Sequence, residues 1–267
     1  ESLLQCDVIG FQTQRYLRNF LNTCLAYIPE ADIDYRASAI TFNGRTTLLK
    51  TYPISIDVRA VVELANSMET LGFRQRLRAY TGDQTIVRID RVEPSKNIVR
   101  GFKAYELLLE QHPEFHGRVK FMAILVPSRL GVEEYQRYLE EIMVVAGWIN
   151  TRYGNEEWQP VELIVGDNYP RAIAAMQLYD VLLVNPLIDG MNLVAKEGVT
   201  ANERGGVLVL SEGAGAAEQL GEYALTVSPT DIVGTKEALR TALEMPLPER
   251  YERANALRDA VSREDLA

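Results

Sequence analysis

The sequence predicts an α/β protein built on a doubly wound parallel sheet, and three observations support this. From Thr85 onward, short β-branched or aliphatic runs alternate with amphipathic stretches. The runs are almost continuously apolar, which is typical of parallel strands that helices cover on both faces. The 267 residues are 47% hydrophobic, enough for the sizeable core that such a domain needs.

The chain before Thr85 has a different pattern. Residues 1–27 carry apolar positions at helical spacing, so we expect helix over much of this stretch. Asn43 and Gly44 stand between two alternating runs, which predicts a β-hairpin. Residues 51–57 predict an extended connector, and residues 58–80 return to a helical pattern.

The second part contains the predicted parallel strands. They are the runs TIVRI (85–89), VKFMAILV (119–126), VELIVG (161–166), DVLLVN (180–185), GVLVL (206–210) and ALTV (224–227). Amphipathic helices are expected between them, one of which has Ile98, Phe102, Tyr105 and Leu109 on a single face. The crossovers should be right-handed.

Composition excludes several classes of function. The formal net charge is -9, so the mean field repels phosphate, and general nucleic-acid or anionic-membrane binding is not expected. No apolar run approaches the roughly 20 residues of a membrane span, and there is no signal peptide. The only two cysteines, Cys6 and Cys24, do not require a disulfide and fit a reducing cytoplasm. The first residue, Glu1, suggests a fragment or a processed chain.

Ligands of open α/β sheets bind beyond the carboxyl ends of the strands, so functional side chains are expected there. After TIVRI come Arg91 and Lys96, on a loop that opens a helix. A helix N-terminus adds free N–H groups and partial positive charge, so this loop predicts a local diphosphate site. Solvated charges in a turn are the alternative interpretation.

A second group of polar residues follows DVLLVN. Asp189 and Gly190 lie between this strand and the next helix, and Glu197 falls two turns later on the side of Leu193. Backbone N–H groups and a carboxylate in this arrangement can bind sugar hydroxyls. The alternative is an N-cap aspartate and a surface glutamate. Arg129 after VKFMAILV and the small residues 211–218 after GVLVL are less specific signals.

Other catalytic patterns are not supported. His112 and His116 have four-residue spacing, but Pro113 follows the first and no cysteine or acidic cluster supports them, so we assign them to a loop and not to a metal site. Two histidines in the whole chain leave little room for a Ser-His-Asp triad. A dinucleotide-binding oxidoreductase is disfavoured because no G-x-G-x-x-G follows the first α/β strand.

Taken together, these strand ends resemble the trehalose-phosphate synthase family of retaining glycosyltransferases. The matching features are Arg91 with Lys96, Ser128-Arg129, Tyr135-Gln136, residues 186–197 at all but one position, and residues 206–217. The opening CDVIGFQT and the YPI connector also resemble the end of that family's N-terminal domain. The similarity covers essentially the whole chain.

The resemblance implies a GT-B architecture of two Rossmann-like domains. Residues 1–56 would be the tail of the N-terminal acceptor domain, 57–247 the nucleotide-sugar donor domain, and 248–267 a terminal helix. The implied reaction moves a glucosyl unit from UDP-glucose or GDP-glucose to a sugar phosphate such as glucose 6-phosphate, with retention. The implied partners are these two substrates and the missing N-terminal half, and a homo-oligomer stays open.

The resemblance also assigns roles to residues. Arg91 and Lys96 would neutralise the leaving diphosphate, so neither a metal nor another cofactor is expected. Arg129 would reach the acceptor phosphate, and Asp189 would hold the sugar hydroxyls. The further donor-binding residues would be Gly190, Met191, Asn192, Leu193, Val194 and Glu197.

Departures from the family pattern keep alternatives open. Glu93 stands where the family has Asp, Asn97 for Gly, Ile188 for Arg, Gly198 for an aromatic residue and Gly213 for Phe. The acceptor could therefore differ, as in the related validoxylamine-phosphate and glucosylglycerol-phosphate synthases. A non-catalytic nucleotide-sugar-binding or regulatory module is the other alternative. If the acceptor half is missing, we expect the isolated chain to bind nucleotide but to turn over poorly.

Overall fold

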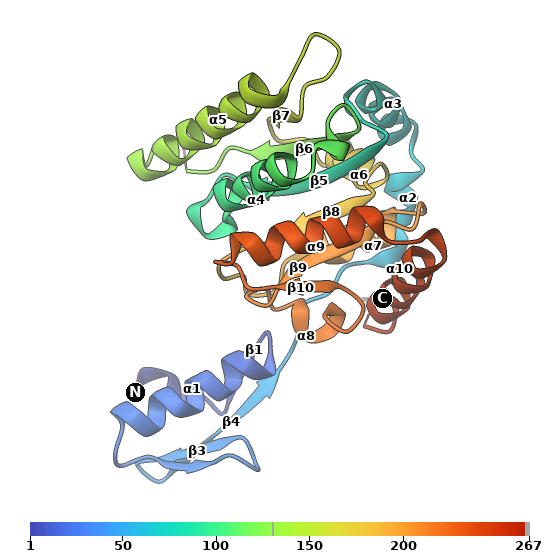
Figure 1. Ribbon diagram of the computed structural model, residues 1–267. Coiled ribbons are helices and arrows are strands. Elements are labelled where there is room, and N and C mark those ends of the chain that lie inside the picture. Colours follow the sequence, from blue (N-terminus) through green and yellow to red (C-terminus); the bar gives the residue numbers. More distant parts are fainter. Residues whose placement is uncertain (130, 265–267) are drawn as a thin grey trace. The chain divides into compact units, whose positions relative to one another are not determined.

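The computed structural model describes residues 1–129 and 131–264 and divides into two compact units (Figure 1). Unit 1 is Glu1–Ile54, and unit 2 begins at Ser55. The boundary that the sequence suggested after residue 56 lies close to this division. Each unit has its own sheet and core, and each is described by itself.

Unit 1 is a four-stranded sheet with one long helix. Its elements are η1 (Ser2–Gln5), β1 (Val8–Phe11), α1 (Gln14–Tyr27), β2 (Asp32–Asp34), β3 (Ala39–Phe42) and β4 (Arg45–Thr51). The strand order is β1-β4-β3-β2, with β1 parallel to β4 and the other pairs antiparallel. Leu17 and Leu21 from α1 pack against Ile40 and Leu49 of the sheet.

The hairpin prediction is confirmed, and the helix expected within residues 1–27 is present in the second half of that stretch. Asn43 and Gly44 join β3 to β4 with φ values of 54° and 74°, as a tight hairpin turn requires. Helix α1 begins only at Gln14, after Thr13 caps it by accepting a bond from the Tyr16 amide at 3.3 Å. The preceding Val8–Phe11 pairs with β4 instead, because a sheet partner distant in sequence outweighs local periodicity. Cys6 and Cys24 are both free thiols.

Unit 2 contains the predicted parallel sheet, and the predicted fold class is confirmed. The strands are β5 (Gln84–Arg91), β6 (Val119–Val126), β7 (Val161–Val165), β8 (Val181–Val184), β9 (Val207–Ser211) and β10 (Leu225–Val227). Their order is β10-β9-β8-β5-β6-β7, with all pairs parallel. Each lies where a run of apolar residues predicted it.

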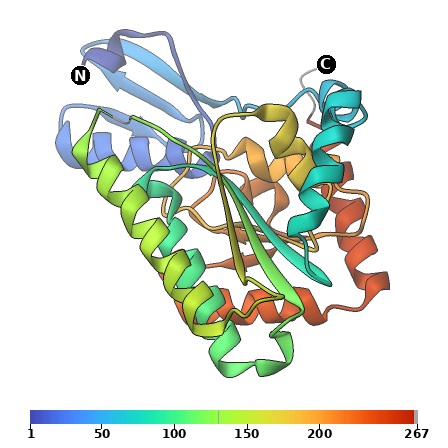
Figure 2. The ribbon, with the colours of Figure 1, turned by 90° about the horizontal axis from the view of Figure 1, so that it is seen from above.

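Helices cover both faces of this sheet (Figure 2). They are α2 (Val58–Ala65), α3 (Met68–Leu77), α4 (Ile98–Gln111), α5 (Glu133–Tyr153), α6 (Tyr169–Met176), α7 (Leu193–Ala201), α8 (Ala217–Leu220), α9 (Ile232–Glu244) and α10 (Leu247–Ser262). Short 3-10 turns are η2 (Arg78–Tyr80), η3 (Pro94–Lys96) and η4 (Pro113–Phe115). Helices α4, α5 and α9 share one core cluster with the sheet, and α2, α6, α7 and α10 share the other.

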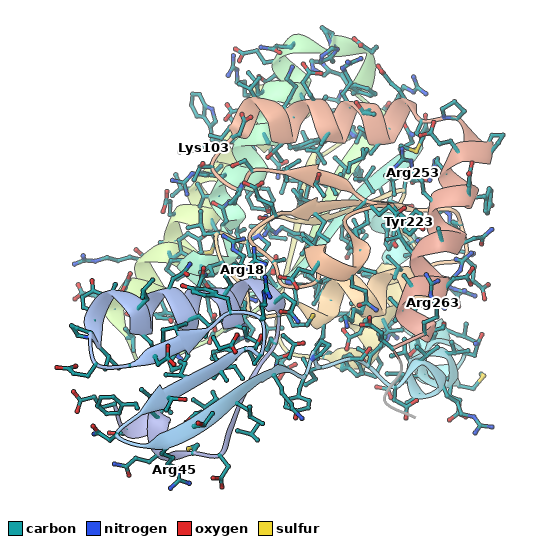
Figure 3. The ribbon with its side chains drawn as sticks, turned by 90° about the horizontal axis from the view of Figure 1, so that it is seen from below. Arg18, Arg45, Lys103, Tyr223, Arg253 and Arg263 are labelled. Atoms are coloured by element: carbon teal, nitrogen blue, oxygen red, sulfur yellow. The ribbon has the colours of Figure 1, made fainter. Side chains whose placement is uncertain are left out.

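Alternation along the strands explains the two clusters. Ile86 and Val87 are neighbours in β5, yet they belong to opposite clusters because successive strand side chains point to opposite faces. The four predicted positions from Ile98 to Leu109 are fully buried on α4. At the C-terminal end, Arg253 of α10 donates to the carbonyl of Tyr223 at 3.4 Å (Figure 3). No helix within the described ranges is long and apolar enough to cross a membrane.

Candidate functional site

The strand order of unit 2 fixes where a ligand should bind. From β5 the chain runs outward through β6 and β7, then returns to β8 on the other side of β5. This reversal is the switch point at which open α/β sheets bind ligands, beyond the carboxyl ends of the strands. Two loops leave those ends, residues 92–97 and 185–192, and the Leu187 amide donates to the Ser95 carbonyl at 2.8 Å. This bond joins the two loops.

A largely buried ion pair connects the same two loops. The Lys96 ammonium lies 2.5 Å from Asp189 Oδ2, and their side chains are only 13% and 15% exposed. Asn192 Nδ2 donates to the same oxygen at 3.0 Å, and the Met191 amide approaches Oδ1 at 3.4 Å. Two motifs far apart in the sequence thus meet at one carboxylate.

The backbone of Asp189 is held by the loop after β9. The Asp189 amide donates to the Gly213 carbonyl at 3.1 Å, and the Gly215 amide donates to the Asp189 carbonyl at 3.0 Å. A Cβ at Gly213 would lie 2.4 Å from the Leu187 carbonyl oxygen, so these loops approach too closely for a side chain. The small residues of 206–217 therefore position Asp189.

Arg91 is the last residue of β5. Its guanidinium lies 2.5 Å from Glu93 Oε1, and its side chain is more than half exposed. Ser128, which follows β6, donates its hydroxyl to the same Glu93 oxygen at 3.2 Å. Glu93, one of the departures from the family pattern, thus links Arg91 to the end of the neighbouring strand.

The first amides of α4 are not free, contrary to the sequence-based expectation. The amides of Ile98 and Val99 donate to the hydroxyl of Tyr138 on α5, at 2.7 and 3.4 Å. Burial raises the pKa of Tyr138, which keeps this hydroxyl neutral. An anion at this loop would therefore contact the side chains of Arg91 and Lys96 before these two amides.

Asn97 explains another departure from the family pattern. Its φ of 59° is left-handed, a conformation that glycine adopts freely and that asparagine tolerates best among other residues. Its buried side-chain amide donates to the carbonyls of Asn185 and Pro229 at 2.9 and 2.7 Å. Its Oδ1 also accepts from Arg100 Nη1 at 3.0 Å. Asparagine in place of glycine thus adds three side-chain hydrogen bonds at this loop.

A buried ion pair between Arg88 and Asp90, which the sequence analysis did not predict, supports the loop of residues 92–97. Arg88 Nη2 donates to Asp90 Oδ2 at 2.7 Å and to the Lys96 carbonyl at 3.0 Å, and Nη1 reaches the Ile98 carbonyl at 3.3 Å. Burial raises the pKa of Asp90, and the adjacent Arg88 opposes that shift. The sequence does contain a signal for this pair, because Arg88 and Asp90 are two charged residues within the otherwise apolar run of β5.

Helix α7 carries the remaining predicted donor residues. Asn192, with φ 80°, is its N-cap and accepts from the Ala195 amide at 3.0 Å. Leu193 and Val194 in the first turn are partly buried against the core. Gly190 is exposed, and a Cβ there would meet nothing within 4 Å. Open space therefore surrounds the position where a sugar is expected.

Glu197 has a partner that the sequence analysis missed. Tyr169, the first residue of α6, donates its hydroxyl to Glu197 Oε1 at 2.9 Å. Burial raises the pKa of Glu197, and the bond from Tyr169 partly lowers it. Tyr169 follows β7 as the other site residues follow their strands, so the same strand-end rule could have found it.

The remaining candidates lie elsewhere. Arg129, with φ 47°, donates to the Tyr135 hydroxyl at 3.2 Å and lies over its ring at 5.5 Å. His112 contacts Glu114, and His116 contacts the Leu109 carbonyl. Across residues 1–129 and 131–264, no three His, Cys, Asp or Glu side chains gather to hold a metal ion.

Comparison with known proteins places this geometry in a family. The model of glycosyltransferase family 20 matches residues 1–267. The chain is 34% identical over 269 residues to a bifunctional trehalose-6-phosphate synthase/phosphatase of Thermoproteus tenax, covering all of this chain and 36% of that protein. It is 32% identical over 263 residues to a UDP-forming alpha,alpha-trehalose-phosphate synthase of Schizosaccharomyces pombe, covering 96% and 50%.

Solved structures give the same result. A UDP-forming trehalose-phosphate synthase from Burkholderia xenovorans in complex with glucose-6-phosphate is 34% identical, with a TM-score of 0.90 over 99% of this chain and 59% of that chain. An Escherichia coli relative bound with UDP-2-fluoro glucose is 34% identical, with a TM-score of 0.88 over 98% and 58%. The chain thus spans between about a third and three fifths of the length of these relatives.

Proposed function

Since the chain belongs to glycosyltransferase family 20, we propose that it forms the nucleotide-sugar-binding part of a retaining hexosyltransferase. The donor is UDP-glucose or GDP-glucose, the acceptor is a sugar phosphate such as glucose 6-phosphate, and the product is then trehalose 6-phosphate. In this proposal, residues 57–247 bind the donor, residues 1–56 belong to the acceptor domain, and residues 248–267 form the terminal helix.

The observation that carries the proposal is the Lys96–Asp189 pair at the switch point of the sheet. An ammonium has three donors, so a bond to Asp189 leaves Lys96 able to donate to a phosphate as well. Together with Arg91, it neutralises the negative charge that develops on the leaving diphosphate. Neither a metal nor another cofactor is required in this proposal.

The neighbouring groups suit the rest of the donor. Asp189 and the amides of Gly190, Met191 and Asn192 bind the sugar hydroxyls, because the open space at Gly190 lies next to them. Glu197, which Tyr169 orients, accepts from the ribose hydroxyls. Leu193 and Val194 lie beside the nucleotide, and Arg129 reaches towards the acceptor phosphate.

The relatives support the classes of substrate. The names of two solved relatives state a UDP-linked fluoroglucose and glucose-6-phosphate as bound compounds. Those compounds match a diphosphate clamp, a hydroxyl-binding carboxylate and an acceptor phosphate site. The proposal transfers these classes of ligand to this chain, with a homo-oligomer left open.

Gly190 provides the experimental test. A methyl group at Gly190 meets open space in the free chain, so Gly190→Ala should leave stability unchanged while its methyl obstructs the sugar. We expect UDP-glucose to bind at least about tenfold more weakly by calorimetry, the equivalent of about 1.4 kcal/mol. Gly72→Ala is the matched control, because its added Cβ also meets nothing within 4 Å. Equal affinity of wild type and Gly190→Ala would contradict the assigned sugar position.

The alternative, a nucleotide-sugar-binding module without transfer activity, rests on Ile188. This side chain is 61% exposed next to Asp189, where the family pattern has arginine. Gly198, the other departure that would favour the alternative, is buried against Leu182, so packing accounts for its small size. A longer protein that contains this chain should transfer glucose from UDP-glucose to glucose 6-phosphate. Binding without transfer by that protein would favour the alternative.

A further inference from the structure

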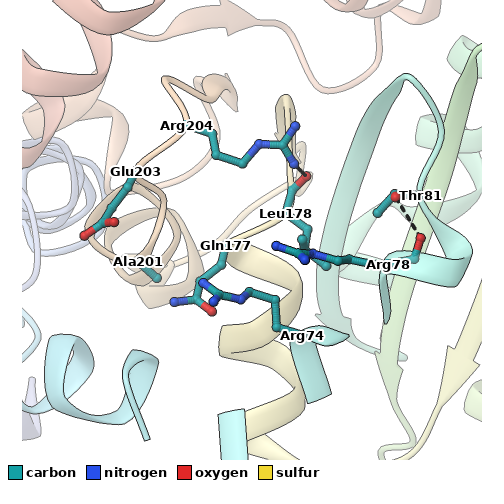
Figure 4. Close-up of a pocket in the computed structure, with 8 residues that line it drawn as sticks. All are labelled: Arg74, Arg78, Thr81, Gln177, Leu178, Ala201, Glu203 and Arg204. Atoms are coloured by element: carbon teal, nitrogen blue, oxygen red, sulfur yellow. Dashed lines mark hydrogen bonds between the residues drawn. The ribbon is translucent and has the colours of Figure 1, made fainter. Parts of the chain in front are cut away.

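Unit 2 has a pocket at the end of the parallel sheet that lies opposite to the candidate donor site. It has a volume of about 400 Å³ and is lined by three arginines, Arg74, Arg78 and Arg204 (Figure 4). Its lining residues belong to segments that precede β5, β8 and β9, so it opens at the amino ends of these strands. Because β5 is eight residues long, the candidate donor site is about 25 Å away.

This arginine pocket is positively charged within an acidic chain. Three arginines and one glutamate, Glu203, line it, for a formal charge of 3 − 1 = +2, whereas the chain carries -9. Arg204 is fixed by the Leu178 carbonyl at 3.1 Å and by Asp180 at 3.8 Å. The guanidinium groups of Arg74 and Arg78 have no hydrogen bond or ion pair within residues 1–129 and 131–264.

Arg74 and Arg78 are not needed to satisfy the end of α6. Helices α6 and α7 end at the rim of the pocket, and each end contributes about half a negative charge. The Met176 carbonyl of α6 already accepts from Asn202 at 3.1 Å, and Leu178 accepts from Arg204. The two helix ends together offset about one of the two net positive charges, so a net charge of about +1 faces a ligand.

We propose that the arginine pocket binds a phosphorylated sugar. Arg74 and Arg78 extend toward Gln177 and Leu178, and Arg204 approaches from a separate loop (Figure 4). A planar guanidinium group can donate two parallel hydrogen bonds to two oxygens of one phosphate. The pocket volume is in the range of small-molecule sites.

Acceptor groups for sugar hydroxyls are also present. Glu203 and Gln177 also line the pocket, and both side chains carry oxygen acceptors. Oε1 of Gln177 is buried without a hydrogen-bond partner among the described residues, so rotation of this amide would bring an unpaired acceptor into the pocket. A bare anion would not use these acceptors, whereas a sugar phosphate carries hydroxyl donors that can. This site is separate from the donor site, and the inference does not rest on the proposed function.

Calorimetric titration of the chain with glucose 6-phosphate and with inorganic phosphate tests the proposal. We expect saturable binding of both, tighter for glucose 6-phosphate. Arg74→Ala/Arg78→Ala should weaken glucose 6-phosphate binding by about tenfold or more. Arg59→Ala/Arg76→Ala removes the same charge from exposed positions of α2 and α3 outside the pocket and should bind as wild type. Circular dichroism verifies that each variant is folded.

Other outcomes overturn the proposal. Absence of binding to either compound would do so, as would equal weakening by the control double variant. Loss of binding in Arg91→Ala/Lys96→Ala would assign the phosphate to the carboxyl edge of the sheet and not to this pocket. Equal affinity for the two compounds would contradict the sugar-binding part and leave a plain anion site.

Discussion

Lys96 and Asp189 form a largely buried ion pair, so their contribution differs from that of an exposed salt bridge. Removing one partner leaves a poorly solvated charge, whereas exposed pairs contribute little. In a double-mutant cycle of Lys96→Ala and Asp189→Ala, we expect a coupling energy of about 1 kcal/mol or more by urea denaturation. Lys120–Glu162 is a comparison pair of similar burial but with a 3.5 Å separation, and its coupling should be smaller. Independent effects of the two substitutions would contradict this.

Glu197 predicts a pH dependence of nucleotide binding. Burial raises its pKa above 4.5, so in the free chain the carboxyl binds its proton more tightly than in the unfolded state. The folded state therefore loses stability as the pH rises from about 4.5 through the raised pKa. Binding to ribose hydroxyls needs the ionised form, so affinity should fall as the pH drops through the same window.

Tyr169 tests this dependence. Its bond to Glu197 lowers the carboxyl pKa, so Tyr169→Phe should move the loss of UDP affinity to higher pH. Titration calorimetry across this pH range measures the shift, and Glu197→Gln should abolish the part of the dependence that the carboxyl causes. An unchanged profile in Tyr169→Phe would show that the pair does not control binding.

Asn97 combines left-handed backbone with two buried side-chain bonds. Asn97→Gly loses the bonds alone, whereas Asn97→Ala loses them and also strains the backbone. We expect both variants to be destabilised, and alanine to be worse than glycine by about 1 kcal/mol. Urea denaturation measures this difference, and equal stability would mean that the loop relaxes.

At the scale of elements, the sequence predicted what depends on periodicity. The six strands of unit 2 are mostly apolar runs, and the buried face of α4 has regular helical spacing, so both could be predicted from the sequence alone. The strand Val8–Phe11 was missed because its partner β4 lies 40 residues later in the chain. The Tyr138 bonds to α4 were missed for a similar reason, since they depend on how α5 packs beside α4.

The site could be predicted only in outline. Strand-end position and the resemblance identified Lys96 and Asp189, which the structure brings into contact. Arg88 donates to the Lys96 carbonyl, and the Asp189 amide donates to the Gly213 carbonyl. These contacts depend on the direction of a side chain and on how closely two loops approach each other. Periodicity carries no information about either.

The contact between α7 and β8 explains why Gly198 replaces an aromatic residue. A Cβ at Gly198 would lie 2.3 Å from Leu182 Cδ2, so Gly198→Ala should cost about 1–3 kcal/mol despite alanine's higher helix propensity. Leu182→Ala in the same chain should reduce that penalty. Gly147→Ala in α5, where the added Cβ meets nothing, should not destabilise. Thermal denaturation compares the three, and a neutral Gly198→Ala would refute the packing account.

At the scale of the molecule, we expect this chain to bind the donor without efficient catalysis. Unit 2 contains both loops of the candidate donor site, whereas the chain covers only 36% to 50% of two curated relatives. Transfer needs a second substrate held in register, which is a large part of catalysis between two reactants. We therefore expect this chain to bind nucleotide but to transfer little glucose to glucose 6-phosphate in a radiolabel assay. A robust rate would show that the acceptor site is already complete.

The most direct test of the central claim is calorimetric titration of the chain with UDP and then GDP, repeated on Arg91→Ala/Lys96→Ala. The proposed diphosphate clamp predicts saturable binding of at least one nucleotide, weakened by about a hundredfold in the double variant. Arg59→Ala/Arg76→Ala, with the same change in charge, should bind as wild type. Binding that survives the loss of Arg91 and Lys96, or no binding of either nucleotide, would contradict a donor site at this edge of the sheet.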